Sequence, residues 1–213
     1  MFIDIPAGSP WGAANAEAKL ALRAKLPGAQ VFDLAALALA NARAAGLSEV
    51  DQLTLAMPAS WLVNSPATSR VLQRWATAPA CGHWLRLVAL LRRDRDELSK
   101  PDARSAMIEH LRPIGEEPWL AEAVSKVLAL VVPEAVPLMP PAARAFVLGG
   151  QQPASAEAFA DMVAWFAVAT ATHHAALSRI GERYGGPPLS GPQALDRLLW
   201  FDSEGHSHFP NAI

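Results

Sequence analysis

Apolar residues recur along this chain at the spacing of an α-helix, and they rarely alternate with polar residues as they would in a β-strand. The segment 83–98 shows this best, because Trp84, Leu87, Val88 and Leu91 lie at positions i, i+3, i+4 and i+7. Alanine and leucine, both good helix formers, dominate the composition. Most prolines fall between the periodic segments, where they begin or end helices. The pattern predicts an all-α fold.

About ten helices are expected, and the proline- and glycine-rich connections between them are short. By residue number they cover about 14–25, 31–45, 48–57, a segment opening at 65–66, 83–98, 99–111, 117–132, 141–148, 155–183 and 192–200. Because short connections place neighbouring helices side by side, we expect a globular orthogonal bundle. The bundle forms a single domain over 1–213, or two lobes divided near 112–118.

Two of these helices carry detailed expectations. The helix at 31–45 is expected to place these apolar residues on one face: Leu34, Leu37, Ala38 and Ala42. The segment 155–183 is expected to form the longest helix, with Ser155 as its N-cap and His173 continuing its apolar stripe.

Composition and charge exclude several classes of protein. Apolar residues make up 52% of the 213 and charged residues 18%, which excludes a disordered chain. The net charge of −2 lacks the basic excess of a general nucleic-acid binder, although a local basic patch stays open. A single cysteine, Cys81, allows no internal disulfide, and the first residues have no signal-peptide pattern. We expect a soluble, cytoplasmic protein without a membrane partner.

Motifs for catalysis or cofactors are scarce. Phosphate-binding glycine loops and nucleophile elbows are absent, so no cofactor is expected. Cys81 and His83 are close in sequence, but a packed cysteine is the simpler interpretation. Weak candidates for a metal site lie in the tail, where alternate residues of an extended chain share a face: Asp202, Glu204, His206 and His208.

The stretch from Glu117 to Val147 carries a family resemblance, together with the closing segment PLSGPQALDRLLWF, Pro188 to Phe201. With its proline-marked turn between helices, the part from Ala123 to Phe146 resembles the helix-hairpin-helix DNA glycosylase superfamily. It is more similar to an uncharacterised bacterial family on that scaffold. The resemblance covers about 80 of 213 residues and implies an all-helical scaffold.

The catalytic features of that superfamily are not preserved. Where the family has a Gly-x-Gly hairpin, the segment 113–118 has one glycine, two glutamates and prolines that lack an N–H. Met139 and Pro140 stand where the resemblance implies a catalytic aspartate. No lysine lies in the hairpin, and Lys126 is within the next helix. The resemblance therefore implies shape without the chemistry.

These observations favour a non-enzymatic protein that binds an unknown protein or small-molecule partner. Its groove is expected between the helix pair of 117–148 and the long helix of 155–183. Four residues are candidates for binding: Trp119, Lys126, Arg144 and His173. Two alternatives stay open, namely an enzyme acting on nucleic acid or a nucleobase, and a metal-dependent enzyme using the tail histidines.

Overall fold

A computed structural model describes residues 2–3, 11–61, 78–93, 95–115 and 120–203. The regular secondary structure of these residues is helical apart from one short antiparallel pair, which joins Phe2–Ile3 to Trp11–Gly12. The predicted all-α fold class is confirmed. None of the helices in these ranges is both long enough and apolar enough to span a membrane.

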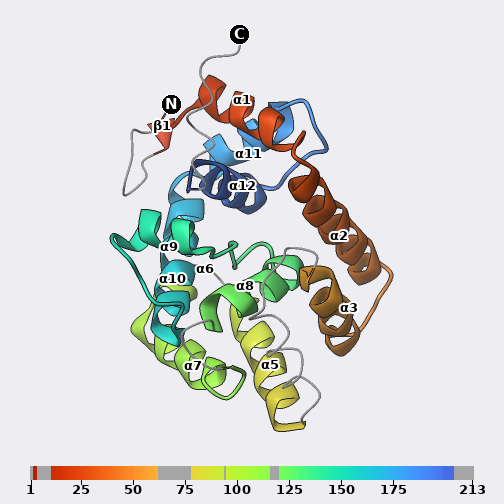
Figure 1. The fold of residues 1–213 in the computed structure, drawn as a ribbon, viewed down its shortest axis with the longest axis vertical. Helices are drawn as coiled ribbons and strands as arrows, with labels where there is room; N and C mark the ends of the chain where they lie inside the picture. The colour runs from red at the N-terminus through yellow and green to blue at the C-terminus, as the bar shows by residue number, and fades with distance from the viewer. Residues whose placement is uncertain (1, 4–10, 62–77, 94, 116–119, 204–213) are drawn as a thin grey trace.

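Helix α8 lies near the centre of the described helices (Figure 1). In chain order the elements are β1 (Phe2–Ile3), β2 (Trp11–Gly12), α1 (Ala13–Arg23), α2 (Pro27–Ala44), α3 (Glu49–Trp61), α5 (Ala78–Leu91), α6 (Arg95–Leu98), α7 (Pro101–Leu111), α8 (Leu120–Val131), α9 (Pro141–Leu148), α10 (Ala156–Thr172), α11 (His174–Arg183) and α12 (Gly191–Ser203).

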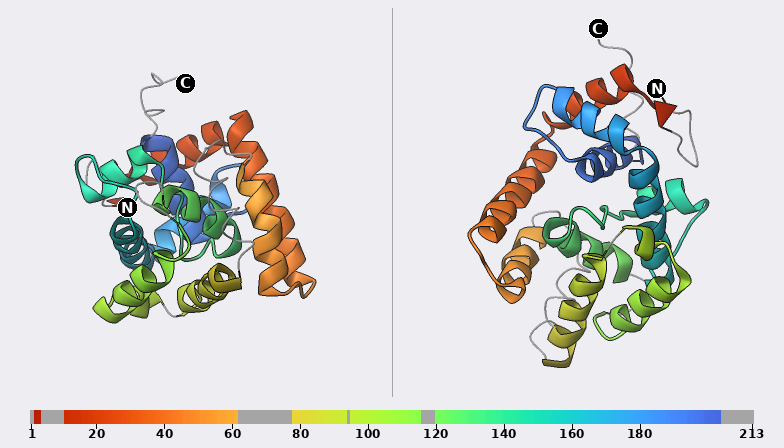
Figure 2. Two further views of the ribbon diagram at one scale, coloured as in Figure 1. Left: turned by 60° about the horizontal axis from the view of Figure 1, so that its bottom comes forward. Right: turned by 180° about the vertical axis from the view of Figure 1, so that it is seen from behind.

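Helix α8 is buried on nearly every side, as both views in Figure 2 also indicate. Its predicted apolar stripe is in the core, but so are the side chains between, including Ser125 and Lys126. A helix that is apolar almost all round is typical of a protein centre. Helix α8 is therefore the central packing unit of the described fold.

Buried side chains form two clusters. The larger cluster surrounds α8 and includes Phe32, Trp84 and Phe159, and it joins residues on both sides of 112–118. The smaller cluster lies among α1, α11 and α12 and includes Leu20 and Phe166. The half-buried Trp165 packs against both clusters. The division of the chain into lobes stays a prediction.

Two helix boundaries differ from the sequence expectation because of proline. Helix α2 begins at Pro27, four residues early, since proline at the first helical position needs no N–H partner. Helix α3 has the expected Ser48 cap, but it continues through Pro58 to Trp61. Pro58 and Thr54 are both exposed. Water can therefore satisfy the Thr54 carbonyl that a residue-58 N–H would have bonded.

The helix expected over 155–183 is two helices, and the segment 83–98 is also divided. Ser155 accepts a hydrogen bond from the Ala158 N–H at 3.2 Å and caps α10 as predicted. The chain leaves helical geometry at His173, with φ −108° and ψ 16°, and α11 starts at the next residue. His173 is half-buried. Its position at a helix junction corrects the expectation of one continuous stripe.

The apolar face predicted on α2 is the exposed face. Leu34 is 66% exposed and Leu37 is 55% exposed. The residues that enter the core are Ala29, Phe32 and Leu39. Because α2 is apolar on both sides, its pattern does not decide which side is buried. The phenylalanine fills the interior, and two leucines stay at the surface.

Candidate binding site

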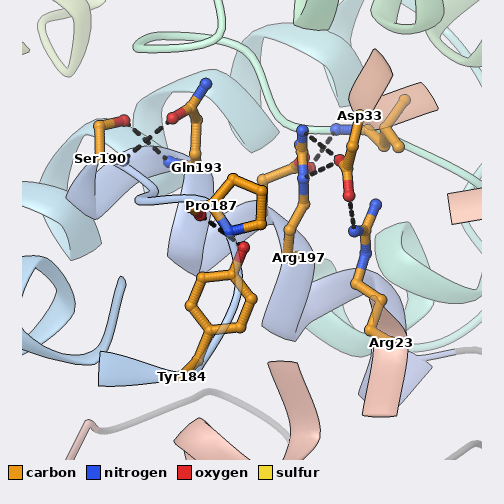
Figure 3. A network of polar contacts seen from close by, with 9 residues as sticks. Arg23, Asp33, Tyr184, Pro187, Ser190, Gln193 and Arg197 are labelled. Carbon is orange, nitrogen blue, oxygen red and sulfur yellow. Dashed lines mark hydrogen bonds and ion pairs between the residues drawn. The ribbon is translucent and has the colours of Figure 1, made fainter. Parts of the chain in front are cut away.

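Two arginines and two aspartates from α1, α2 and α12 form one ion-pair cluster, which we call the Arg–Asp cluster (Figure 3). Arg23 Nη1 lies 2.6 Å from Asp33 Oδ2. Arg197 Nε and Nη2 lie 3.0 and 2.9 Å from Asp33 Oδ1. Arg197 Nη1 also donates to the Asp196 carboxylate. The cluster therefore ties residues near both ends of the described chain.

The Arg–Asp cluster is buried except at Asp33. The side chains of Arg23, Asp196 and Arg197 are almost fully enclosed, whereas that of Asp33 is 33% exposed. Burial, followed by the charge of Arg197, lowers the pKa of Arg23, and Asp33 opposes that shift. Two buried guanidinium groups need two carboxylates nearby, because an unpaired buried charge is costly.

Asp196 also fixes the connection between α8 and α9. Its Oδ1 accepts a hydrogen bond from the Leu138 N–H at 2.7 Å, and both residues are buried. The next N–H, that of Met139, donates to Ser125 Oγ at 3.1 Å. These bonds join the α8–α9 connection to α12 and to α8. They satisfy backbone groups in a proline-rich connection that has no helical partners for them.

Aromatic rings flank the two arginines. The Arg23 guanidinium lies 5.5 Å from the Trp200 ring centroid, and that of Arg197 lies 4.9 Å from the Phe32 ring centroid. Both distances are within cation–π range. Phe32 thus has two roles, because it fills the core and also holds Arg197 beside Asp33.

A pocket of about 500 Å³ opens beside the cluster, between α2 and the connection from α11 to α12. Most of its lining is apolar, and Asp33 and Arg197 contribute the charged groups. The described lining residues are Ala24, Gln30, Asp33, Leu34, Ala36, Leu37, Ala40, Tyr184, Pro187, Pro188, Leu189, Gln193 and Arg197. An apolar lining with a few polar groups at this volume is typical of small-molecule sites.

The far wall of the pocket is held in place by hydrogen bonds. The Tyr184 hydroxyl donates to the Pro187 carbonyl at 2.6 Å (Figure 3). The Leu189 N–H donates to the Gly181 carbonyl at 3.2 Å. A Cβ atom at Gly181 would lie only 2.4 Å from the Leu189 carbonyl oxygen, so this approach requires glycine. Burial, followed by the charge of Asp33, raises the pKa of Tyr184.

Two of the predicted binding residues, Lys126 and Arg144, are buried and bond to groups within the protein. Lys126 Nζ lies 3.1 Å from Glu122 Oε1, within α8. Arg144 Nη1 donates to the Met139 carbonyl at 2.6 Å. Burial lowers the pKa of Arg144, and the charge of Glu122 opposes that shift. Lys126 and Arg144 line neither the pocket beside the Arg–Asp cluster nor the one between α9 and α10.

The other predicted site residues are elsewhere. His173 lies at the junction of α10 and α11. Trp119, Glu204, His206 and His208 fall outside the described residues. Asp202 forms an ion pair with Lys19 at 2.7 Å. Among the residues that the structure describes, no three His, Cys, Asp or Glu side chains gather to hold a metal ion.

A second pocket lies between the end of α9 and the first turns of α10, and its described lining includes no residue of α8 and none of the predicted binding residues. Its volume is about 560 Å³. Two carboxylates at its edge are occupied, because Glu157 pairs with Arg112 and Asp161 pairs with Arg104. Polar lining exceeds apolar lining in this pocket. The pocket beside the Arg–Asp cluster is therefore the better binding candidate.

Sequence reasoning missed Asp33, Tyr184 and Arg197. One signal was available, since Asp33 is the one charged residue in the otherwise uncharged run from 26 to 42. A lone acid in an apolar helix needs a partner when the helix packs. The identity of the partner has no local signal, because Arg197 is 164 positions away.

In the part of the chain that the structure describes, the fold and the site define an all-α protein with an apolar pocket that contains two charged side chains. No protein-family profile, curated protein or solved structure matches this chain.

Proposed function

We propose that this protein is a non-enzymatic binding protein whose site is the pocket between α2 and the α11–α12 connection. The observation that carries the proposal is the combination of apolar walls with the partly exposed Asp33. Leu34 and Leu37 at the edge of the pocket are more than half exposed. A ligand that covers them gains apolar burial, at about 25 cal/mol per Å².

The chemistry of the pocket supports binding over catalysis. Its described lining includes no His, Cys, Ser, Thr or Lys. Asp33 is held by two arginines, and the Tyr184 hydroxyl is engaged with a carbonyl. A general base needs an acceptor poised to take a proton near neutral pH.

The scaffold belongs to the same proposal. The segments that resemble the helix-hairpin-helix glycosylases pack together through Asp196 and Leu138. The buried Met139 stands where the family resemblance implies a catalytic acid. We therefore interpret the chain as a glycosylase-like scaffold that binds without cleaving.

A fluorescence titration with Nile red, which is apolar and uncharged, tests the site. Ala40 lines the pocket and is exposed, so Ala40→Trp is expected to obstruct the pocket without disturbing the core. The matched control is Ala38→Trp, on an exposed position of α2 outside the lining. We expect Nile red binding to weaken at least tenfold in the first variant and to persist in the second. Equal binding by both variants would reject this pocket as the site.

A further inference from the structure

We propose that the pocket beside the Arg–Asp cluster takes an uncharged, mainly apolar small molecule whose polar end carries an N–H or O–H donor. This inference rests on the proposed binding function and adds the chemistry of the ligand. Three observations support it: the charge balance of the cluster, the free hydrogen-bonding capacity of the lining, and the apolar walls.

The charges at the pocket balance. Arg23 and Arg197 are matched by Asp33 and Asp196, so the formal charge of the cluster is zero. A ligand cation beside Asp33 would be attracted by that carboxylate and repelled by two guanidinium groups held within 3.0 Å of it. These effects largely cancel, while the ligand would still lose its hydration.

A ligand anion meets a different obstacle. Both guanidinium groups are enclosed. Arg197 uses Nε, Nη1 and Nη2 on the two aspartates, and Arg23, whose Nη1 bonds Asp33, does not line the pocket. The member of the cluster that remains exposed is the Asp33 carboxylate, at 33%. An anion entering the pocket would therefore face like charge first. Neither a cationic nor an anionic ligand therefore meets a net opposite charge in this pocket.

Two groups of the lining offer acceptors, and one of them is charged. Asp33 accepts two hydrogen bonds and has one further ion-pair contact, and a carboxylate has about four acceptor positions. The Tyr184 hydroxyl donates its proton to the Pro187 carbonyl, and its oxygen can still accept. Gln30 and Gln193 each keep amide N–H groups, because Gln30 uses one N–H on the Ala24 carbonyl and Gln193 uses its Oε1 on the Ser190 N–H. The charged acceptor therefore determines the preference for a donor.

A donor placed near Asp33 would gain a hydrogen bond to a charged acceptor, which is stronger than one between neutral groups. Asp33 and Tyr184 line the same pocket, so both acceptors face one ligand. The apolar body of the ligand would then lie against the leucines and prolines of the two walls. The residues that would contact the ligand body are Leu34, Leu37, Pro188 and Leu189.

Four probes with the same ring separate the possibilities: cyclohexanecarboxamide as a neutral donor, methyl cyclohexanecarboxylate as a neutral acceptor, cyclohexanecarboxylate as an anion, and cyclohexylmethylammonium as a cation. Binding to the unaltered protein is measured by chemical-shift titration, which detects weak association. We expect the carboxamide to bind about tenfold more tightly than the ester, as one hydrogen bond to a charged group allows. Both ions should bind more weakly than the carboxamide.

Variants test which groups select the donor. Tyr184→Phe removes one acceptor, and Asp33→Asn removes the charge on the other. Each should reduce the preference for carboxamide over ester, whereas Ala38→Ser, outside the lining, should leave it unchanged. Since Asp33→Asn also removes a partner of buried arginines, Tyr184→Phe keeps the test decisive if that variant fails to fold.

Several results would overturn this inference without affecting the proposed site. Tightest binding by the carboxylate or by the ammonium compound would show that the pocket selects a charge. Equal binding of ester and carboxamide would show that no donor is selected. Failure of all four probes, in a protein that binds Nile red in the pocket, would also reject the inference. Failure of the Ala40→Trp experiment would instead reject the site itself.

Discussion

Asp33 on α2 accepts a hydrogen bond from Arg197 Nε on α12 at 3.0 Å, and Arg197 Nη2 forms an ion pair with the same oxygen at 2.9 Å. This pair holds α2 against the C-terminal helices on one side of the pocket. Leu34 and Leu37 line the same pocket as Asp33 and remain exposed at its edge.

Removal of the Asp33 carboxylate should destabilise the fold. Asp33→Ala leaves two buried guanidinium groups with one aspartate between them, and we expect a loss of about 2–3 kcal/mol because Asp33 is partly exposed. Urea denaturation measures the change. Asp161→Ala is the control, since it breaks the half-exposed pair with Arg104 and should cost at most about 1 kcal/mol. Equal losses would contradict a special role for the cluster.

Asp196 should be more sensitive to deletion than to amidation. Asp196→Ala removes the acceptor of the buried Leu138 N–H and also the second partner of Arg197. We expect a loss of about 3 kcal/mol or more. Asp196→Asn keeps an oxygen for Leu138 and should cost less. Thermal unfolding of both variants decides the order, and the reverse order would refute this account of the Leu138 bond.

The two faces of α2 should respond differently to truncation. Phe32→Ala opens a cavity in the core and removes the ring beside Arg197, so we expect a loss of about 3–5 kcal/mol. Leu34→Ala, on the same helix, should change stability by less than about 0.5 kcal/mol because the side chain is exposed. Similar losses from both would mean that the face of Leu34 is covered in solution.

The same glycine substitution should have opposite effects at two positions. Gly181→Ala places a Cβ against the Leu189 carbonyl, and we expect a loss of about 1–3 kcal/mol with displacement of the pocket wall. A Cβ at Gly82, inside α5, meets nothing within 4 Å. Gly82→Ala should therefore stabilise the protein by about 0.5–1 kcal/mol. Chemical denaturation of both variants checks the two signs.

Stability should fall as the pH drops below about 6.5. The rings of His83 and His110 lie 5.6 Å apart between α5 and α7. Burial lowers the pKa of His110, the charges of His83 and Arg86 lower it further, and Glu109 opposes them. The unfolded chain then binds a proton that the folded chain resists, so stability is greatest above the unfolded pKa and is lost toward the folded one.

Urea denaturation at pH 7.5 and 5.5 measures this loss. His110→Gln should reduce the difference between the two conditions. Glu109→Gln should increase it, because it removes the charge that favours the protonated imidazole. An unchanged difference in both variants would assign the pH dependence to other groups.

The sequence predicted what depends on local patterns. The fold class, the Ser155 cap, the α9 boundaries and the burial of Trp84, Leu87, Val88 and Leu91 all follow from spacing and capping residues. The buried face of α2 did not follow, since apolar residues lie on both sides of that helix. The break at His173 also had no signal, because an apolar stripe continues through it.

The candidate site was harder to predict for a physical reason. Lys126 and Arg144 are expected at a groove between 117–148 and 155–183, and the structure places both in the interior. The pocket is built instead from α2, the 184–189 connection and α12. Contacts between such distant segments are set by packing of the whole chain, which residue spacing does not record.

The 164-residue separation of Asp33 and Arg197 has a consequence for synthesis. During translation α2 is made early, whereas α12 is the last helix described. Until α12 is released, Asp33 lacks Arg197, Phe32 lacks its cation, and one side of the pocket does not exist. A nascent chain can therefore carry the exposed leucines of α2 but has no complete site. Ligand binding would report that synthesis has passed α12.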